Sequence, residues 1–116
     1  MRRNFRPERK DRTHGPLALR FEQHGCSVLT LPASVPGLPD LLVGCARANH
    51  LVELKDPESR YGRAGLSVAQ QEFADTWRGE PVAVASTGAD VDALVARWRA
   101  AVALDRASDP RMARKP

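Results

Sequence analysis

The chain has 116 residues, a length that suits one domain with a single modest core. Its 18 basic and 14 acidic residues give a net charge of +4, which favours a polyanionic partner. Two widely spaced cysteines exclude a disulfide framework and a cysteine zinc site, and no apolar run approaches membrane-spanning length. Because no signal-peptide pattern follows the basic N-terminus, we expect a cytoplasmic protein, in a bacterium or in the cytosol of a host cell if a phage encodes it.

Basic side chains gather at both ends of the chain. Six of the first twelve residues are arginine or lysine, and the last six residues hold three more and no acid. Residues 1–14 are predicted to form a flexible basic arm, and residues 105–116 a charged, disordered tail. Residues 15–104 are the predicted folded domain. The two ends either contact a polyanion or serve only as solubilising tails.

The predicted domain opens with a helix. Pro16 suits its first turn, Leu17 and Phe21 give it an apolar face, and Gly25 ends it. Periodicity, turn residues and helix caps then predict strands over residues 26–31, 41–43 and 50–55, a helix over 67–78, a strand over 81–85, and a last helix capped by Asp90 and ending near residue 104.

These elements predict an α/β fold in the order α-β-β-β-α-β-α. Short connections make the first three strands an antiparallel meander, and a helical crossover makes the fourth strand parallel to the third, with a right-handed connection. The result is a four-stranded mixed sheet flanked by helices. Val68, Phe73 and Trp77 on the second helix, and Trp98 on the third, are expected to face the core.

Two short motifs contain the candidate catalytic residues. Pro39-Asp40 precedes one predicted strand, and Glu53-Leu54-Lys55 ends the next. Glu53 and Lys55 are two residues apart, so their side chains share one face of a strand. The two carboxylates and the backbone carbonyl of Leu54 are an oxygen donor set for Mg²⁺, with Mn²⁺ as a substitute. Beside a lysine, such a site fits metal-assisted hydrolysis of a phosphodiester; a turn aspartate and an exposed Glu/Lys pair is the plainer alternative.

A family resemblance rests on three ordered segments. Residues 37–43 (GLPDLLV), 51–55 (LVELK) and 66–70 (LSVAQ) resemble the PD-(D/E)XK nuclease superfamily. Within it, the chain is most similar to the small virus-type replication-repair nucleases (VRR-NUC) and, more distantly, to the archaeal Holliday-junction resolvases. The resemblance covers about residues 17–96 and implies a restriction-endonuclease-like αβββαβα core.

The resemblance also implies an activity. It implies a magnesium-dependent endonuclease acting on DNA, with Asp40, Glu53 and Lys55 as the catalytic trio and Gln70 as an accessory residue on the following helix. Gln70 has a structural role to weigh against this one, because Ser67 and Gln70 match a helix capping box. The two roles do not exclude each other.

Five further residues are candidates with plain alternatives. Glu22 on the first helix is a further acidic metal ligand, as in many members of the superfamily, or a solvated residue of the helix face. Ser34 binds a phosphate or stabilises a turn. Arg60, Tyr61 and Arg63 follow the motif lysine and either hold DNA, by phosphate contact and base stacking, or belong to an ordinary polar loop.

The predicted function is therefore hydrolysis of DNA phosphodiester bonds in replication, recombination or repair. Branched or flapped DNA is the substrate class that the resemblance implies. One alternative is a homodimeric Holliday-junction resolvase, which needs two sites for two symmetric cuts. An alternative of another class is a non-catalytic DNA-binding module that keeps the nuclease fold.

Overall fold

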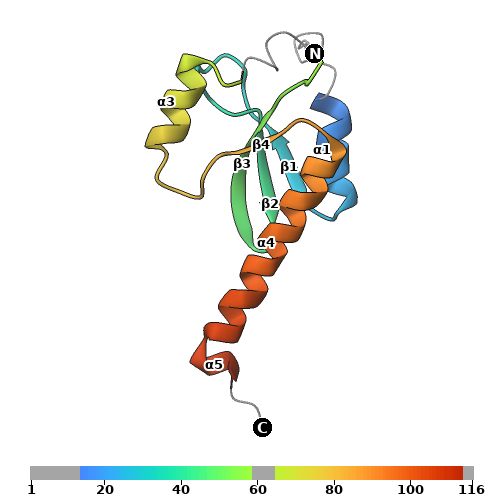
Figure 1. Cartoon of the computed structure of the whole chain (residues 1–116), viewed down its shortest axis with the longest axis vertical. Helices are drawn as coiled ribbons and strands as arrows, with labels where there is room; N and C mark the ends of the chain where they lie inside the picture. The colour runs from blue at the N-terminus through green and yellow to red at the C-terminus, as the bar shows by residue number, and fades with distance from the viewer. Residues whose placement is uncertain (1–13, 59–64, 114–116) are drawn as a thin grey trace, which may run out of the picture.

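The computed structural model describes residues 14–58 and 65–113 (Figure 1). The expected α/β class, with a four-stranded mixed sheet flanked by helices, is confirmed. In the part of the chain that is described, no helix is both long and apolar enough to cross a membrane. The elements in chain order are α1 (His14–Gln23), β1 (Ser27–Thr30), β2 (Leu41–Cys45), β3 (Ala48–Leu54), α3 (Val68–Thr76), β4 (Ala83–Ala85), α4 (Gly88–Ser108) and α5 (Pro110–Ala113).

The sheet has the strand order β1-β2-β3-β4. β1, β2 and β3 form the predicted antiparallel meander, and β4 is parallel to β3. The register pairs Thr30 with Leu41, Leu41 with Val52, and Val52 with Ala83. Because paired residues point to the same face of a sheet, these four paired residues share one face. Their neighbours along each strand point to the other face.

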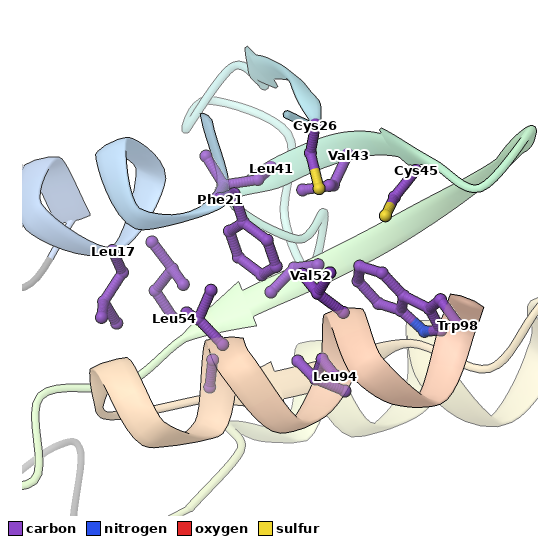
Figure 2. Packing of buried hydrophobic residues seen from close by; sticks show 13 residues of the cluster. Leu17, Phe21, Cys26, Leu41, Val43, Cys45, Val52, Leu54, Leu94 and Trp98 are labelled. Carbon is purple, nitrogen blue, oxygen red and sulfur yellow. The ribbon is translucent and has the colours of Figure 1, made fainter. Parts of the chain in front are cut away.

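The core lies between that face and the helices α1 and α4 (Figure 2). Phe21 of α1 stacks on Trp98 of α4 with ring centroids 5.9 Å apart. Each fully buried side chain of this size contributes about 1.5–3 kcal/mol to folding through the hydrophobic effect. The helices contribute Leu17 and Phe21 from α1, and Val91, Leu94, Val95 and Trp98 from α4.

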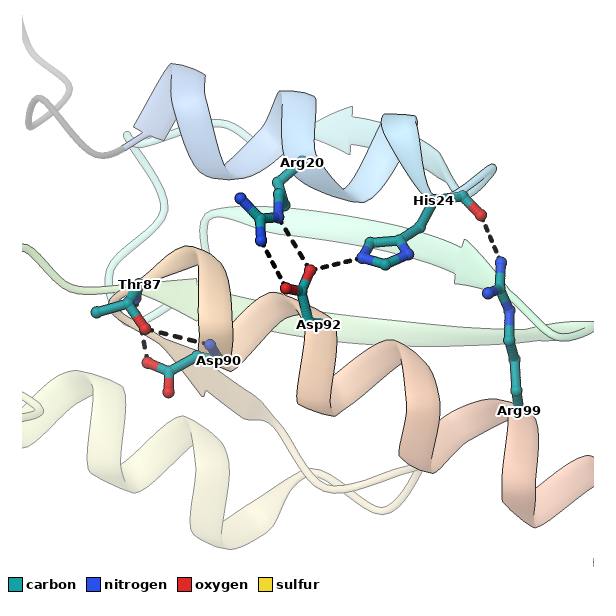
Figure 3. A network of polar contacts seen from close by, with 6 residues as sticks. All are labelled: Arg20, His24, Thr87, Asp90, Asp92 and Arg99. Carbon is teal, nitrogen blue, oxygen red and sulfur yellow. Dashed lines mark hydrogen bonds and ion pairs between the residues drawn. The ribbon is translucent and has the colours of Figure 1, made fainter.

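A polar seam joins α1 and α4 on the outside of this core (Figure 3). The Asp92 carboxylate accepts hydrogen bonds from Arg20, at 2.9 and 2.5 Å, and lies 2.7 Å from Nε2 of His24. Arg99 donates to the backbone carbonyl of His24. These contacts fix how the two helices lie along each other, while the apolar side chains beneath them supply the burial.

Two tight turns set the sheet geometry. Gly25 has a φ of +90° just after α1, as its predicted role at the helix end requires. Between β2 and β3, Ala46 and Arg47 have φ of +54° and +68°. Positive φ at both central residues of a two-residue hairpin is the type I′ geometry, which favours Asn-Gly in sequences. Ala-Arg does not carry that signal, so the sequence does not identify this turn type.

The expected burial of α3 is wrong. Val68 is 85% exposed and Trp77 is 47% exposed, and α3 has no buried residue. The helix ends at Thr76, and Trp77 stacks on Phe73 with ring centroids 5.4 Å apart. An apolar stripe on a helix predicts which face contacts other apolar groups, but those groups need not belong to the core. Here the two aromatic rings cover each other without entering the core.

The start of the last helix also differs from its prediction. The N-cap is Thr87, and Asp90 is the third helical residue, whose carboxylate accepts from the backbone N–H of Thr87 (Figure 3). Thr87 and Asp90 form a capping box at the start of this helix. Because both side chains accept hydrogen bonds there, the sequence pattern points to Asp90 as the N-cap.

Part of the expected disordered tail, residues 105–116, is helical in the structure as far as residue 113. α4 runs to Ser108, and α5 spans Pro110–Ala113. Asp109 caps the junction, where its carboxylate accepts a hydrogen bond from the backbone N–H of Arg111 at 2.9 Å and pairs with that arginine's guanidinium at 2.8 Å.

Candidate functional site

The backbone of Asp40 lies just before β2 and pairs with the residue that follows β1. Its carbonyl accepts a hydrogen bond from the backbone N–H of Leu31 at 2.8 Å, which extends the β1–β2 ladder by one pair. One carboxylate oxygen, Oδ2, accepts from the backbone N–H of Leu54 at 2.8 Å. The side chain therefore lies against the end of β3, with little freedom to swing away.

Glu53 lies beside Asp40 on the face of the sheet opposite the core. The register pairs Leu41 with Val52, so Asp40 and Glu53 form the next pair and point the same way. Glu53 is only 5% exposed. Burial, and then the negative charge of Asp40, raise the pKa of Glu53 to about 7, although Lys55 acts in the opposite direction. Two adjacent carboxylates with so little solvent are a site that favours a cation.

Lys55 and Gln70 complete a hydrogen-bonded cluster around Glu53. The Lys55 ammonium lies 3.6 Å from Oε2 of Glu53 and donates to Oε1 of Gln70 at 2.9 Å. The Gln70 amide donates in turn to Oε2 of Glu53 at 2.7 Å. Gln70 thus bridges the acid and the base, which fixes the ammonium beside the carboxylates.

Gln70 serves the helix and the site at once. The capping box predicted from Ser67 and Gln70 is confirmed: Oε1 of Gln70 accepts from the Ser67 backbone N–H at 2.9 Å, and Oγ of Ser67 accepts from the Gln70 backbone N–H at 3.2 Å. The same oxygen accepts from Lys55. The start of α3 is therefore tied directly to the charged cluster on β3.

Gly37 is a residue of this site to which the sequence assigns no role. It has a φ of +79°, and a Cβ atom there would lie 2.5 Å from the backbone oxygen of Ala69. No side chain fits at that separation. The loop that leads to Asp40 and the first turn of α3 therefore touch backbone to backbone, and only glycine permits the contact. A glycine three residues before an aspartate is the only sequence signal for it.

The donor set fits a divalent cation only in part. The fixed bonds use one oxygen of Asp40 and one of Glu53, and the second oxygen of each can serve as a ligand. The N–H and C=O of one strand residue point to the same side, so the carbonyl of Leu54, whose N–H reaches Asp40, also faces the pair. Within residues 14–58 and 65–113, no group of three His, Cys, Asp or Glu side chains gathers to hold a metal. A cation here would complete its coordination with water and with substrate oxygens.

Of the remaining candidates, the structure describes Glu22 and Ser34, and neither takes part in the bonds of this cluster. Glu22 is exposed on α1 and belongs to no such group of three, so the structure does not bring it to Asp40 and Glu53 as a further ligand. Ser34 is exposed in the loop before Asp40. Arg60, Tyr61 and Arg63 lie outside the described residues, as does the basic arm except for His14, which begins α1.

Comparisons with family models, with curated proteins and with solved structures found no match to this chain. The function is therefore inferred from the residues and geometry of the chain itself.

Proposed function

We propose that the protein is a metal-dependent DNA endonuclease of the PD-(D/E)XK type, most like the small virus-type replication-repair nucleases. The observation that carries the proposal is the cluster of Asp40, Glu53, Lys55 and Gln70 on one end of the sheet. The amide of Gln70 bonds to Glu53 and Lys55, the ammonium of Lys55 lies 3.6 Å from Glu53, and the carboxylate of Asp40 lies beside that of Glu53. A structural ion pair needs one acid and one base, here Glu53 and Lys55. It does not account for Asp40, a second, half-buried acid beside Glu53.

Mg²⁺ at this pair, when bound, would supply polarisation of the scissile phosphate and activation of a water molecule. Asp40 and Glu53 would hold the cation, with the carbonyl of Leu54 as a third oxygen. The hydrogen bond from the Leu54 N–H keeps Asp40 in the orientation that this requires. Relief of the repulsion between the two carboxylates is part of the binding energy of the cation.

Lys55 would position the attacking water and neutralise charge that develops on the phosphate. Its ammonium is mostly shielded from solvent and is already oriented by Gln70 at 2.9 Å, so little reorganisation is needed when substrate binds. A flexible surface lysine would lose its rotamer freedom at that moment. Gln70 acts as a positioning residue for both Lys55 and Glu53.

Branched or flapped DNA in replication, recombination or repair is the proposed substrate class, and it rests on the family resemblance. The net charge of +4 favours such a polyanion. Arg60, Tyr61 and Arg63 lie between Lys55 and Gln70 in the sequence and remain candidates for holding the nucleic acid.

The proposal is tested by incubating the protein with end-labelled duplex, flap, single-stranded and four-way-junction DNA, in Mg²⁺, Mn²⁺ or EDTA. We expect cleavage that needs the metal and falls at least about 100-fold in Asp40→Asn and in Lys55→Met. Glu22→Gln is the matched control, because it removes an acid that lies outside the cluster, and it should cut normally.

Two other outcomes separate the alternatives. Tight DNA binding by folded protein, without cleavage of any substrate in either metal, would support a DNA-binding module instead. Paired symmetric cuts in the four-way junction, by a species that sediments as a dimer, would support a homodimeric resolvase.

A further inference from the structure

The two cysteines of the chain lie together in the core. Cys26, just before β1, and Cys45, at the end of β2, are each 7% exposed, and both are free thiols (Figure 2). They belong to the same apolar cluster as Phe21 and Trp98. They sit at the end of β2 opposite Asp40, so the candidate nuclease site does not use them.

The strand register places the two thiols face to face. β1 and β2 pair Ser27 with Gly44, so Cys26 lies opposite Cys45 one pair further on. The backbone N–H of Leu31 donates to the carbonyl of Asp40, which marks that pair as hydrogen-bonded. Hydrogen-bonded and non-hydrogen-bonded pairs alternate along an antiparallel ladder.

The alternation, followed from that pair to the cysteines, makes theirs a non-hydrogen-bonded pair. The backbone N–H of Cys26 accordingly turns away from β2 and donates to the carbonyl of Phe21 at 3.1 Å. Cα atoms of such a pair lie about 4.5 Å apart, with their side chains close. A disulfide spans Cα separations of about 4.4–6.8 Å, so the backbone already has the geometry that the bond requires.

We propose that Cys26 and Cys45 are a redox modification site that closes as a reversible intramolecular disulfide on reaction with a small-molecule disulfide such as oxidised glutathione. One cysteine, as its thiolate, attacks a sulfur of the oxidant, forms a mixed disulfide and releases one reduced thiol. The second cysteine then attacks the mixed disulfide, forms the bond between Cys26 and Cys45, and releases the second reduced thiol. The protein loses two electrons and two protons, and the oxidant is reduced.

Closure would tie together both ends of the segment that carries Asp40. Residues 27–44 include β1, the proline-containing loop, Asp40 and most of β2. A bond across a segment of this length restricts the unfolded chain and stabilises the native state. The reaction should be slow in the folded protein. Burial, followed by a hydrogen bond with Cys45, raises the pKa of Cys26 to about 12, which keeps its thiol protonated at neutral pH.

The test uses the full chain, folded and at low concentration, incubated with oxidised glutathione and then blocked with an alkylating agent. We expect intact-mass spectra to show loss of two hydrogens with no glutathione retained and no alkylation. Cleavage before aspartate separates Cys26, in residues 11–39, from Cys45, in residues 40–55. The two peptides should run as one species that a reductant splits.

A second readout is thermal unfolding of the oxidised protein with and without reductant. We expect the disulfide to raise Tm by at least about 5 °C. Cys26→Ala and Cys45→Ala serve as matched controls, because each leaves one thiol, which cannot form an intramolecular disulfide. A wild-type protein that stays reduced while folded, that retains glutathione on one cysteine, or whose Tm falls on oxidation would overturn the proposal. None of these outcomes depends on nuclease activity.

Discussion

The helices α3 and α4 begin with the same capping motif but are held to the domain by different contacts. Each starts with a capping box, Ser67 with Gln70 in α3 and Thr87 with Asp90 in α4. α4 then buries four side chains in the core, whereas α3 buries none. α3 is held instead by the bonds of Gln70 to Glu53 and Lys55 and by the close approach of its first turn to the loop before Asp40.

This difference assigns stability mainly to α4 and the proposed function partly to α3. α4 supplies the apolar face that the sheet requires in order to fold. α3 lies over the opposite face and presents one amide to the charged cluster. A helix that is held by a few polar contacts at one end is free to adjust when a substrate binds. The comparison therefore predicts that changes in α4 affect stability and changes in α3 affect activity.

The two tryptophans give the largest contrast. Trp98→Ala removes a buried ring that stacks on Phe21 and should cost about 3–5 kcal/mol of unfolding free energy. Trp77→Ala removes a ring that is 47% exposed and should cost less than about 1 kcal/mol. Urea unfolding followed by circular dichroism measures both. Trp98→Phe keeps the protein folded if the alanine variant does not. Equal costs for the two positions would show that α3 is packed after all.

Substitutions of Gln70 and Ser67 distinguish the proposed catalytic role of Gln70 from its role in capping α3. Gln70→Ala removes the bonds to Glu53 and Lys55 and should reduce cleavage about 10- to 100-fold, with little change in DNA affinity. Ser67→Ala removes only the cap acceptor, should cost about 0.5–2 kcal/mol of stability, and should leave cleavage nearly unchanged at a temperature where the protein is folded.

Gln71→Ala is the control for both variants, because Gln71 is exposed and donates to Asp75 of its own helix. Single-turnover cleavage rates and thermal unfolding are the measurements. If Gln70→Ala lost stability but kept its cleavage rate, the amide would be a cap and nothing more.

Glu53 should make the metal-free protein less stable as the pH rises. Its pKa is about 7 in the folded state against an ordinary 4.5. Between these values the native state binds more protons than the unfolded state, so stability falls with rising pH, by up to about 1.4 kcal/mol per pH unit, and levels off above pH 7. Glu53→Gln should remove this slope. The proposed Mg²⁺ site requires both carboxylates in their ionised form, so Mg²⁺ should raise Tm more at pH 8 than at pH 5.

Thermal unfolding across this pH range, in EDTA and in Mg²⁺, measures both effects. Glu22→Gln is again the matched control, since it removes an exposed carboxylate and should keep the slope. A wild-type slope of the opposite sign would show that Glu53 is stabilised as the carboxylate in the folded protein.

The sequence predicts the order of the elements, and it predicts that Asp40 and Glu53 lie on adjacent strands, because both follow from local rules. Alternation along a strand assigns its faces, and short connections make neighbours antiparallel. The exposure of Trp77 does not follow from such rules. An apolar stripe shows which side of a helix prefers burial, but whether another layer covers that side depends on the rest of the fold.

The role of Gly37 and the hydrogen bond from Lys55 to Gln70 do not follow from local sequence patterns, although the family resemblance implies that Gln70 belongs to the site. Both are contacts between segments about 15 to 32 residues apart, and no local pattern reports such a distance. The Ala46–Arg47 turn is a different case. Its backbone is of a type that sequences normally mark with asparagine or glycine, and here the pairing of β2 with β3 imposes it on residues without that preference.

Asp92 should give the smallest effect of the series. It joins α1 to α4 through Arg20 and His24, which hold the pKa of its carboxyl well below the ordinary range. An acid whose pKa is lowered on folding stabilises the fold at pH values above its unfolded-state pKa. This stabilisation is lost as the pH falls through the folded-state pKa. All three side chains are partly exposed, so solvent screens most of the attraction. Asp92→Asn should therefore lower Tm only slightly at pH 7 and less still at pH 3, and added salt should shrink the difference. A loss comparable to that of Trp98→Ala would mean that the polar seam, rather than the apolar layer beneath it, holds α1 against α4.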